Sequence, residues 1–269
     1  MPVTKPPIIW KGAHPNNFSV GRQRHGGKVV LNECVVVHTT GGGQTIEALQ
    51  SWFNNPDAHA STTFGIGPTA AGKVEIHQYV SLDDTPYAHG IMQAPTARLA
   101  IENGGISPNL WAIGVELIDG GTPGNHSAAM LIALWDLFAW LFEDVILPNK
   151  AITGAAVDRD HILGHYQITS VDRAQCPSWP EARYTATIAA VKQRLGGVVL
   201  PPPPPDPLIA LRAQVATLTA EVARLRGALV LTRQGLVEEA GRLAAEHQTR
   251  AMRLALFREG IDNIIGPAG

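Results

Sequence analysis

The chain has ten histidines and two cysteines, and position in the sequence singles out three of them as candidate metal ligands. His38 ends the apolar run 34–37 and is followed by three glycines within five residues, His165 directly follows Gly164, and Cys176 lies in a loop that contains two prolines. Two imidazoles and one thiolate suit Zn²⁺ and leave a fourth tetrahedral position open, which is typical of catalytic zinc. Zinc in such a site would lower the pKa of a bound water to about 7 and supply hydroxide near neutral pH.

Each of these residues also has a purely structural interpretation. A lone histidine is most often a core or surface residue with ordinary partners, and a lone buried cysteine behaves as a small hydrophobic residue. The spacing does not by itself bring the three together, because 127 positions separate His38 from His165. A shared metal therefore requires a fold that places them side by side.

Strands and helices alternate in the predicted fold. We expect strands at 34–37, at 63–67 and 74–80 as a pair around the turn 71–73, and at 111–117. Helices are predicted at 46–54, 127–142 and 185–195, the first with Thr45 as N-cap and with a packed face of Ile46, Leu49, Trp52 and Phe53. This order predicts an α/β domain with a mixed central β-sheet flanked by helices.

The strand over 111–117 singles out an acidic residue. Successive side chains of a strand point to opposite faces, so Ile113, Val115 and Leu117 should share one face. Glu116 then shares the other face with Ala112 and Gly114. Small neighbours leave room there, so a cleft beside Glu116 is expected.

The order of these motifs resembles a known family. The chain is similar over about residues 30–185 to the zinc-dependent N-acetylmuramoyl-L-alanine amidases of the phage-lysozyme and peptidoglycan-recognition type. The segments that carry the resemblance are Val36-Val37-His38-Thr39-Thr40-Gly41, Ala60 to Ile66, Gly72 to Val80, Asp83 to Gly90, Ile113-Gly114-Val115-Glu116-Leu117, Gly164-His165 and Cys176-Pro177. Each segment is a weak signal alone, and their common order makes the signal strong.

The resemblance implies a function and a set of roles. His38, His165 and Cys176 match the family's three zinc ligands, and Glu116 matches an acidic residue that some members place near the metal-bound water. The implied reaction is cleavage, by zinc-activated water, of the amide bond between N-acetylmuramic acid and the L-alanine of the stem peptide in peptidoglycan. Glu116 would take and return the proton.

The chain departs from the family pattern at two places. Many members have Lys or Thr two residues before the last ligand, where this chain has Ala174, so the neighbouring Arg173 becomes a candidate to face the developing oxyanion. Other members have a Tyr where this chain has Thr62, which shifts the proton-carrying role to Glu116. Thr62, Arg173 and His89 are the candidate substrate contacts, with a hydrogen bond to a metal ligand as the alternative for His89. His77 is expected to face solvent.

Composition divides the chain into three parts. We predict a catalytic domain at 1–195, a Pro-rich linker at 196–207 that contains five consecutive prolines, and a helical accessory segment at 208–269. The last part has a coiled-coil-like apolar repeat with alternating spacings of three and four, at Leu208, Leu211, Val215, Leu218, Val222, Leu225 and Leu229. A homo-oligomer formed through these helices is the expectation. Packing on the chain's own catalytic domain, and binding to the cell wall or a membrane surface, are the alternatives.

Several classes of protein fit the sequence poorly. A net charge of −2 argues against a nucleic-acid binder, two cysteines exclude a disulfide-dense scaffold, and no apolar run approaches the roughly 20 residues that span a bilayer. The N-terminus lacks the apolar stretch of a signal peptide. With the resemblance, this predicts a phage endolysin made in the host bacterial cytoplasm that then acts on the cell wall. The alternatives are a cytoplasmic muropeptide-recycling amidase, a non-catalytic peptidoglycan-recognition module and a structural coiled-coil protein.

Overall fold

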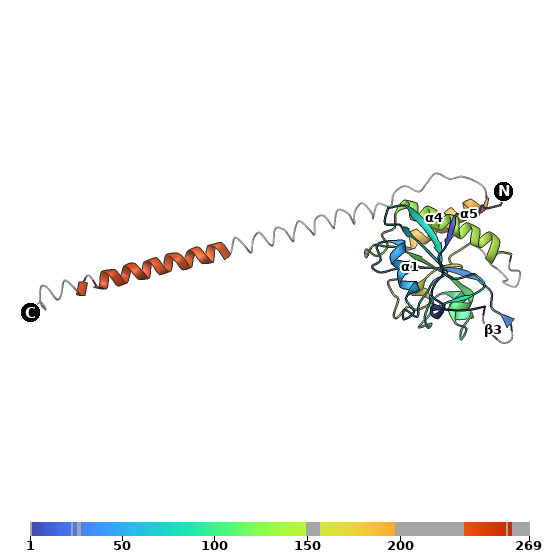
Figure 1. Cartoon of the computed structure of the whole chain (residues 1–269), viewed down its shortest axis with the longest axis horizontal. Coiled ribbons are helices and arrows are strands. Elements are labelled where there is room, and N and C mark those ends of the chain that lie inside the picture. Colours follow the sequence, from blue (N-terminus) through green and yellow to red (C-terminus); the bar gives the residue numbers. More distant parts are fainter. Residues whose placement is uncertain are drawn as a thin grey trace, which may run out of the picture. The chain divides into compact units, whose positions relative to one another are not determined.

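The computed structural model describes residues 2–22, 24–25, 28–148, 157–196, 234–256 and 258–259. The chain divides into two units, Met1–Pro204 and Pro205–Gly269. The first contains a six-stranded sheet (Figure 1) in the spatial order β1 (Ile8–Trp10), β7 (Val74–Gln78), β6 (Phe64–Pro68), β9 (Ala112–Leu117), β5 (Cys34–Thr39) and β10 (Ile162–Gly164). β6 and β7 are antiparallel and all other neighbours are parallel, so the predicted mixed sheet is confirmed.

Helices and short elements complete this unit. The α-helices are α1 (Ile46–Asn54), α2 (Arg98–Glu102), α3 (Pro108–Trp111), α4 (Ala128–Leu141) and α5 (Glu181–Gly196). Single turns of helix are η1 (Pro15–Asn17), η2 (Phe142–Ile146) and η3 (His165–Gln167). Two small two-stranded sheets pair β2 (Phe18–Ser19) with β8 (Thr85–Pro86) and β3 (Arg24–His25) with β4 (Lys28–Val29).

The two faces of the sheet are covered by different helices. One face presents Val35, Val37, Ile113, Val115, Leu117, Phe64 and Ile66, which join a core with buried residues of α4 and α5. The other face presents His38, Glu116 and Gly65, which the register places on one line across β5, β9 and β6. A Cβ added to Gly65 would meet Leu49 of α1 at 2.8 Å, so α1 lies on this second face. The predicted alternation along β9 is confirmed.

Local sequence explains where the main helices begin. The Thr45 side chain accepts a hydrogen bond from the Ala48 N–H at 3.3 Å, and Ser127 accepts one from the Met130 N–H at 3.2 Å, which are the side-chain caps that helix N-termini prefer. Eight of the fourteen residues of α4 are buried, in accord with its nearly continuous apolar sequence. In Figure 1, α4 and α5 run side by side over the sheet.

The structure corrects two expectations about single residues. Trp52 was expected on the packed face of α1, but it is 52% exposed, because Ile46, Leu49 and Phe53 fill the contact with the sheet. His77 was expected to face solvent, but it is 1% exposed and bonds Glu75 at 3.0 Å. The reason is β1, which pairs with β7 and covers the edge that the sequence left open.

The accessory part of the chain contains a helix at 234–256. All residues of this helix are exposed, including Leu236, Leu243 and Leu254, and Arg242 bonds Glu239 at 2.6 Å and Glu246 at 2.7 Å. Apart from Gly196, the predicted linker at 196–207 lies outside the described residues, as does the heptad repeat from Leu208 to Leu229.

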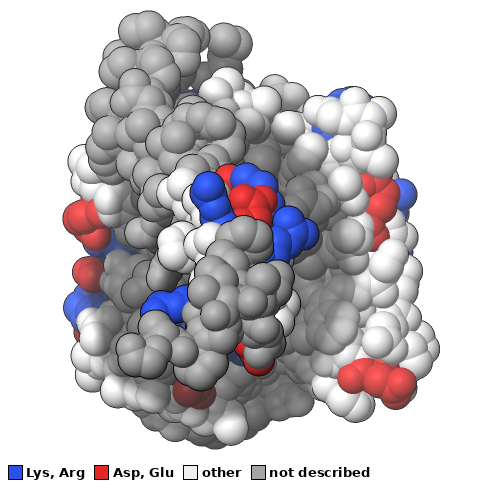
Figure 2. All heavy atoms as spheres, turned by 90° about the vertical axis from the view of Figure 1, so that its left-hand side faces the viewer, with Lys and Arg blue, Asp and Glu red and all other residues white. Residues whose placement is uncertain are grey.

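Among the described residues, no helix combines the length and apolar character needed to cross a membrane. On the face drawn in Figure 2, acidic and basic side chains of the described residues are interspersed. No continuous patch of one sign is visible among the described residues of that face.

Candidate metal centre and its cleft

The sheet itself brings His38 and Glu116 together. β5 and β9 are parallel neighbours, and their register places these two residues opposite each other. Nδ1 of His38 lies 3.9 Å from Oε1 of Glu116. The imidazole is 2% exposed and the carboxyl side chain 19% exposed, so both lie at the inner end of an opening to solvent.

His165 reaches the same place from the next strand. β10 pairs with β5 so that Gly164 lies opposite Val37, and His165 follows Gly164 at the level of His38. The two imidazole rings have centroids 4.2 Å apart. Gly164 is required here, because an added Cβ would come within 2.7 Å of the ring of Tyr166.

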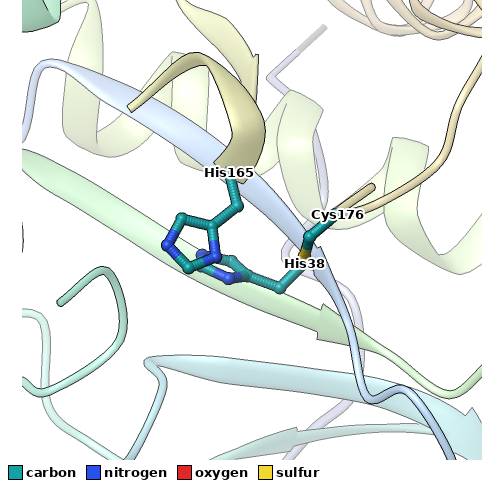
Figure 3. Close-up of side chains that lie close together, drawn as sticks. All are labelled: His38, His165 and Cys176. Carbon is teal, nitrogen blue, oxygen red and sulfur yellow. The ribbon is translucent and has the colours of Figure 1, made fainter. Parts of the chain in front are cut away.

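Cys176 arrives on a loop that hydrogen bonds hold against the sheet. Its carbonyl accepts a bond from the Tyr166 N–H at 2.9 Å, and its Sγ accepts one from the Thr39 N–H at 3.4 Å. One ligand atom from each of His38, His165 and Cys176 lies within 4.8 Å of the other two (Figure 3). The fold therefore brings the three residues predicted as metal ligands into one possible metal site.

Burial sets the ionisation of these groups. It lowers the pKa of His165 to about 4 and that of His38 well below its usual value, and in His38 the neighbouring histidines and Arg173 add to the effect. Both imidazoles are therefore neutral at pH 7, which is the form that binds metals. Burial, with Glu116 as a second cause, raises the pKa of Cys176 to about 12.

Glu116 is the carboxyl group at the centre of the site. Burial, with Asp119 as a second cause, raises its pKa to about 8, whereas the charge of Arg173 acts in the opposite direction. Its Oε2 has no hydrogen-bond partner among the described residues. A partly buried carboxyl with an unpartnered oxygen and such a pKa can exchange a proton near neutral pH.

An open cleft of about 920 Å³ lies over these residues. Its lining includes His38, His165, Cys176, Glu116, Arg173 and His89. Thr62 is 1% exposed and does not appear among the lining residues, although the neighbouring Ser61 does. Contact of Thr62, His89 and Arg173 with a substrate stays a prediction.

Sequence reasoning missed other residues of the cleft. Trp52 and Tyr87 line it as exposed aromatic side chains, and Asp119 lines it while 2% exposed. Asn109 lies beneath it, where its Oδ1 accepts hydrogen bonds from the N–H groups of Ala88 and His89 at 3.0 and 2.8 Å. Asp119 could have been identified as a candidate site residue from its place two residues after the strand at 112–117. Nothing in the sequence identifies Asn109 as a candidate.

Comparisons with known proteins give a family and several similar folds. The family model described as N-acetylmuramoyl-L-alanine amidase matches residues 28–179, a range that contains every predicted site residue. No curated protein sequence matches the chain.

Similar solved structures include an endolysin, a catalytic domain and a hydrolase. A mutant endolysin from Bacillus subtilis is 18% identical, with 69% of this chain and 98% of the other covered and a TM-score of 0.46. The PlyG catalytic domain is 15% identical, with 71% and 96% covered and a TM-score of 0.47. The Staphylococcus aureus hydrolase AmiA, in complex with its ligand, is 16% identical, with 74% and 89% covered and a TM-score of 0.46.

Proposed function

The chain belongs to the N-acetylmuramoyl-L-alanine amidase family and is a peptidoglycan amidase, and on that premise we propose that it works with a zinc ion held by His38, His165 and Cys176. The observation that carries the proposal is the approach of the three ligand atoms to within 4.8 Å of one another at the inner end of the cleft. The bond cleaved is the amide between N-acetylmuramic acid and L-alanine.

The residues present fit a zinc ion. Two neutral imidazoles and a thiol form a donor set that zinc prefers, and the thiol ionises when it binds a metal. Without a cation, the partly buried sulfur of Cys176 and the unpartnered Oε2 of Glu116 lie at the inner end of the cleft. A doubly charged cation would stabilise both groups in their ionised forms.

Glu116 is the proposed proton carrier. Zinc at this site would polarise the scissile carbonyl and acidify a coordinated water. Glu116 lines the cleft with a side chain that is 19% exposed, so its carboxyl group can accept the proton from the attacking water and return it to the leaving nitrogen. In the metal-free chain burial raises the pKa of Glu116 to about 8, and a zinc ion beside it would lower that pKa again, so the ionised carboxylate would first act as the base and its protonated form would then act as the acid.

Arg173 is proposed to stabilise the oxygen of the amide carbonyl as negative charge develops on it. Its guanidinium lines the cleft and acts on the ionisation of His38, His165, Cys176 and Glu116, so its charge reaches every group at the centre of the site. Preorganised positive charge at such an oxygen lowers the barrier. Many family members have Lys or Thr at the position of Ala174 to face the developing oxyanion, and we propose that Arg173 has that role here.

The proposed biological role is lysis of a bacterial host by a phage endolysin. Such an enzyme is made in the host cytoplasm and reaches the wall when the membrane is breached. The support is the organisation of the chain, in which a run of five prolines and a helical segment follow the predicted catalytic domain at 1–195. An enzyme that recycles small soluble fragments has no evident use for these parts.

The test uses purified cell wall and the full chain. We expect new L-alanine amino termini to be released, the release to stop with a chelator, and zinc to restore it. Binding without release would instead identify a recognition module, and release of reducing sugar ends would identify a glycosidase. Activity on soluble muropeptides but not on intact wall would favour the recycling role.

Self-association through the C-terminal helices is a separate proposal. It is supported by the heptad repeat from Leu208 to Leu229 and by the exposed Leu236, Leu243 and Leu254 of the helix at 234–256. The full chain should sediment as an oligomer, and the double change Leu218→Lys with Leu225→Lys should give a monomer. Ala213→Lys with Ala220→Lys adds the same charge at positions outside the repeat and should leave the oligomer intact. An oligomer in both variants, or a monomeric parent, would refute the proposal.

A further inference from the structure

His89 contacts both histidines of the proposed metal centre. Its Nδ1 lies 2.9 Å from Nε2 of His38, and its backbone carbonyl lies 3.0 Å from Nε2 of His165. The side chain is 0% exposed, and its ring stacks on that of His38 with centroids 4.9 Å apart. One residue therefore holds two ligands, one through its side chain and the other through its backbone.

These two contacts decide which nitrogen of each ligand is free. The carbonyl of His89 can only accept, so Nε2 of His165 carries the proton and Nδ1 keeps its lone pair. Nε2 of His38 is occupied by His89, which leaves Nδ1 of His38, the atom that faces Glu116 at 3.9 Å. A histidine binds a metal through one nitrogen while the other is held by a hydrogen bond.

Asn109 holds the backbone of His89 in place. Oδ1 of Asn109 accepts hydrogen bonds from the backbone N–H groups of Ala88 and His89, at 3.0 and 2.8 Å. Asn109 belongs to α3, which leads directly into the strand that carries Glu116. Gly114 of that strand leaves room for the ring, since a Cβ there would lie 3.3 Å from Cε1 of His89.

We propose that His89, fixed by Asn109, is a positioning residue that holds both histidine ligands with Nδ1 free for the metal. The inference rests on the proposed zinc site. It assigns His89 to the metal ligands rather than to the substrate, although the residue also lines the cleft. The side chain forms its hydrogen bond with His38, and the backbone, held by Asn109, forms one with His165.

The experiment measures zinc affinity of the metal-free full chain by competition with a chromogenic chelator. His89→Leu removes the hydrogen-bonding atom with little change in volume and should weaken zinc binding about 10- to 100-fold. His89→Asn places an amide oxygen near the position of Nδ1 and should restore affinity to within about threefold of the parent. His77→Leu is the matched control, because His77 is also a buried, hydrogen-bonded histidine but lies on β7, and it should leave affinity unchanged.

A second pair of variants tests the backbone contact and does not depend on the folding of His89→Leu. Asn109→Ala should weaken zinc binding, and Asn109→Asp, which keeps the acceptor oxygen, should bind more tightly than Asn109→Ala. Cobalt substituted for zinc should show an altered visible spectrum in His89→Leu and a parent-like spectrum in His77→Leu.

Parent-like zinc affinity in both His89→Leu and Asn109→Ala would overturn the inference, and so would equal weakening in His89→Leu and His89→Asn. If the parent itself fails to bind zinc, the proposed metal site fails as well. Tight binding by the parent and by both His89→Leu and Asn109→Ala refutes the positioning role and leaves the proposed metal site standing.

Discussion

The two halves of the proposed metal centre are built in different ways. His38 and Glu116 lie on adjacent central strands, where backbone pairing fixes them opposite each other. Arg173 and Cys176 lie on a loop, and residues 171–175 of this loop are exposed. Among the described residues, a few hydrogen bonds hold the loop in place, such as those of Cys176 with Tyr166 and Thr39. The strand half is therefore set by the fold as a whole, whereas the loop half depends on individual contacts.

This difference assigns different tasks to the two halves. Residues on buried parallel strands change position only if the sheet changes, so they suit groups that must be preorganised. A loop can supply the last ligand and a charged group with little constraint on the rest of the domain. We expect substitutions in the loop half to remove function without unfolding the chain, and substitutions in the strand half to couple function with stability.

The largest effect is expected in the loop half, at Cys176. Cys176→Ala removes one of three proposed ligands and should abolish both zinc retention and amide hydrolysis while leaving the thermal transition of the metal-free chain in place. Cys34→Ala is the matched control, because Cys34 is fully buried in the core and its truncation should cost about 1 kcal/mol of stability but no activity. Metal analysis, wall hydrolysis and thermal unfolding measure these quantities. Parent-like hydrolysis by Cys176→Ala would refute the ligand assignment.

The next largest effect is expected in the strand half, at Glu116. Glu116→Gln keeps the shape of the side chain but removes the proton carrier, so kcat should fall about 10²- to 10⁴-fold. Zinc affinity should remain within a few fold of the parent. Glu102→Gln, at an exposed carboxylate that pairs with Arg98 at 2.7 Å, should leave kcat unchanged. A fall of less than tenfold in Glu116→Gln would contradict the assigned role.

The third largest effect is expected on the stability of the strand half, at Gly114. Gly114→Ala adds a Cβ that would lie 2.7 Å from Oγ1 of Thr62 and 2.9 Å from Cβ of Ala88, so the strand or its neighbours must shift. We expect a loss of about 1–3 kcal/mol in the free energy of unfolding, measured with denaturant. Gly196→Ala, where an added Cβ meets nothing within 4 Å, is the control. An unchanged free energy in Gly114→Ala would show that the strand half is less tightly packed than we infer.

The smallest effect is expected on the pH dependence of stability. It depends on a buried hydrogen bond between His126 and Trp179, close in sequence to the loop half. His126 is 0% exposed and its Nδ1 accepts a hydrogen bond from Nε1 of Trp179, three residues beyond Cys176. Burial, with Arg183 as a second cause, lowers the pKa of His126 to about 3 in the folded chain, below the usual histidine value of about 6.5. The unfolded chain therefore binds the proton first, and stability falls as pH drops from about 6.5 towards 3.

The measurement is the free energy of unfolding at pH 7 and pH 5. His126→Asn keeps an acceptor without the titration, so it should lose about 2 kcal/mol less than the parent between these pH values. Equal losses in the two proteins would show that His126 becomes protonated in the folded chain.

Much of the strand half could be predicted from the sequence. The β-branched run before His38 and the alternation around Glu116 are signals of buried strands, and both residues lie where those signals place them. β1 was not predicted, and the segment before His165 that forms β10 could be interpreted only as a strand or a turn, because each has three residues, too few for a period to be recognised. The absence of β1 from the prediction explains why His77 was misplaced.

The loop half could be predicted only through resemblance. The residues around Cys176 have no periodicity, and their approach to His38 follows from a chain path that spacing does not encode. Asn109 had no signal because its role depends on backbone N–H groups of residues about 20 positions away. Contacts of this kind can be recognised only in a three-dimensional structure.

The pairing of β5 with β9 also limits how such a chain can vary in length. One residue inserted or deleted between Val35 and His38 would turn the imidazole toward the α4 side of the sheet, because successive strand residues point to opposite faces. The same change in β9 would bury Glu116 beneath that helix. Insertions and deletions compatible with catalysis should therefore occur before Cys34, beyond Thr39, or in the connections between strands.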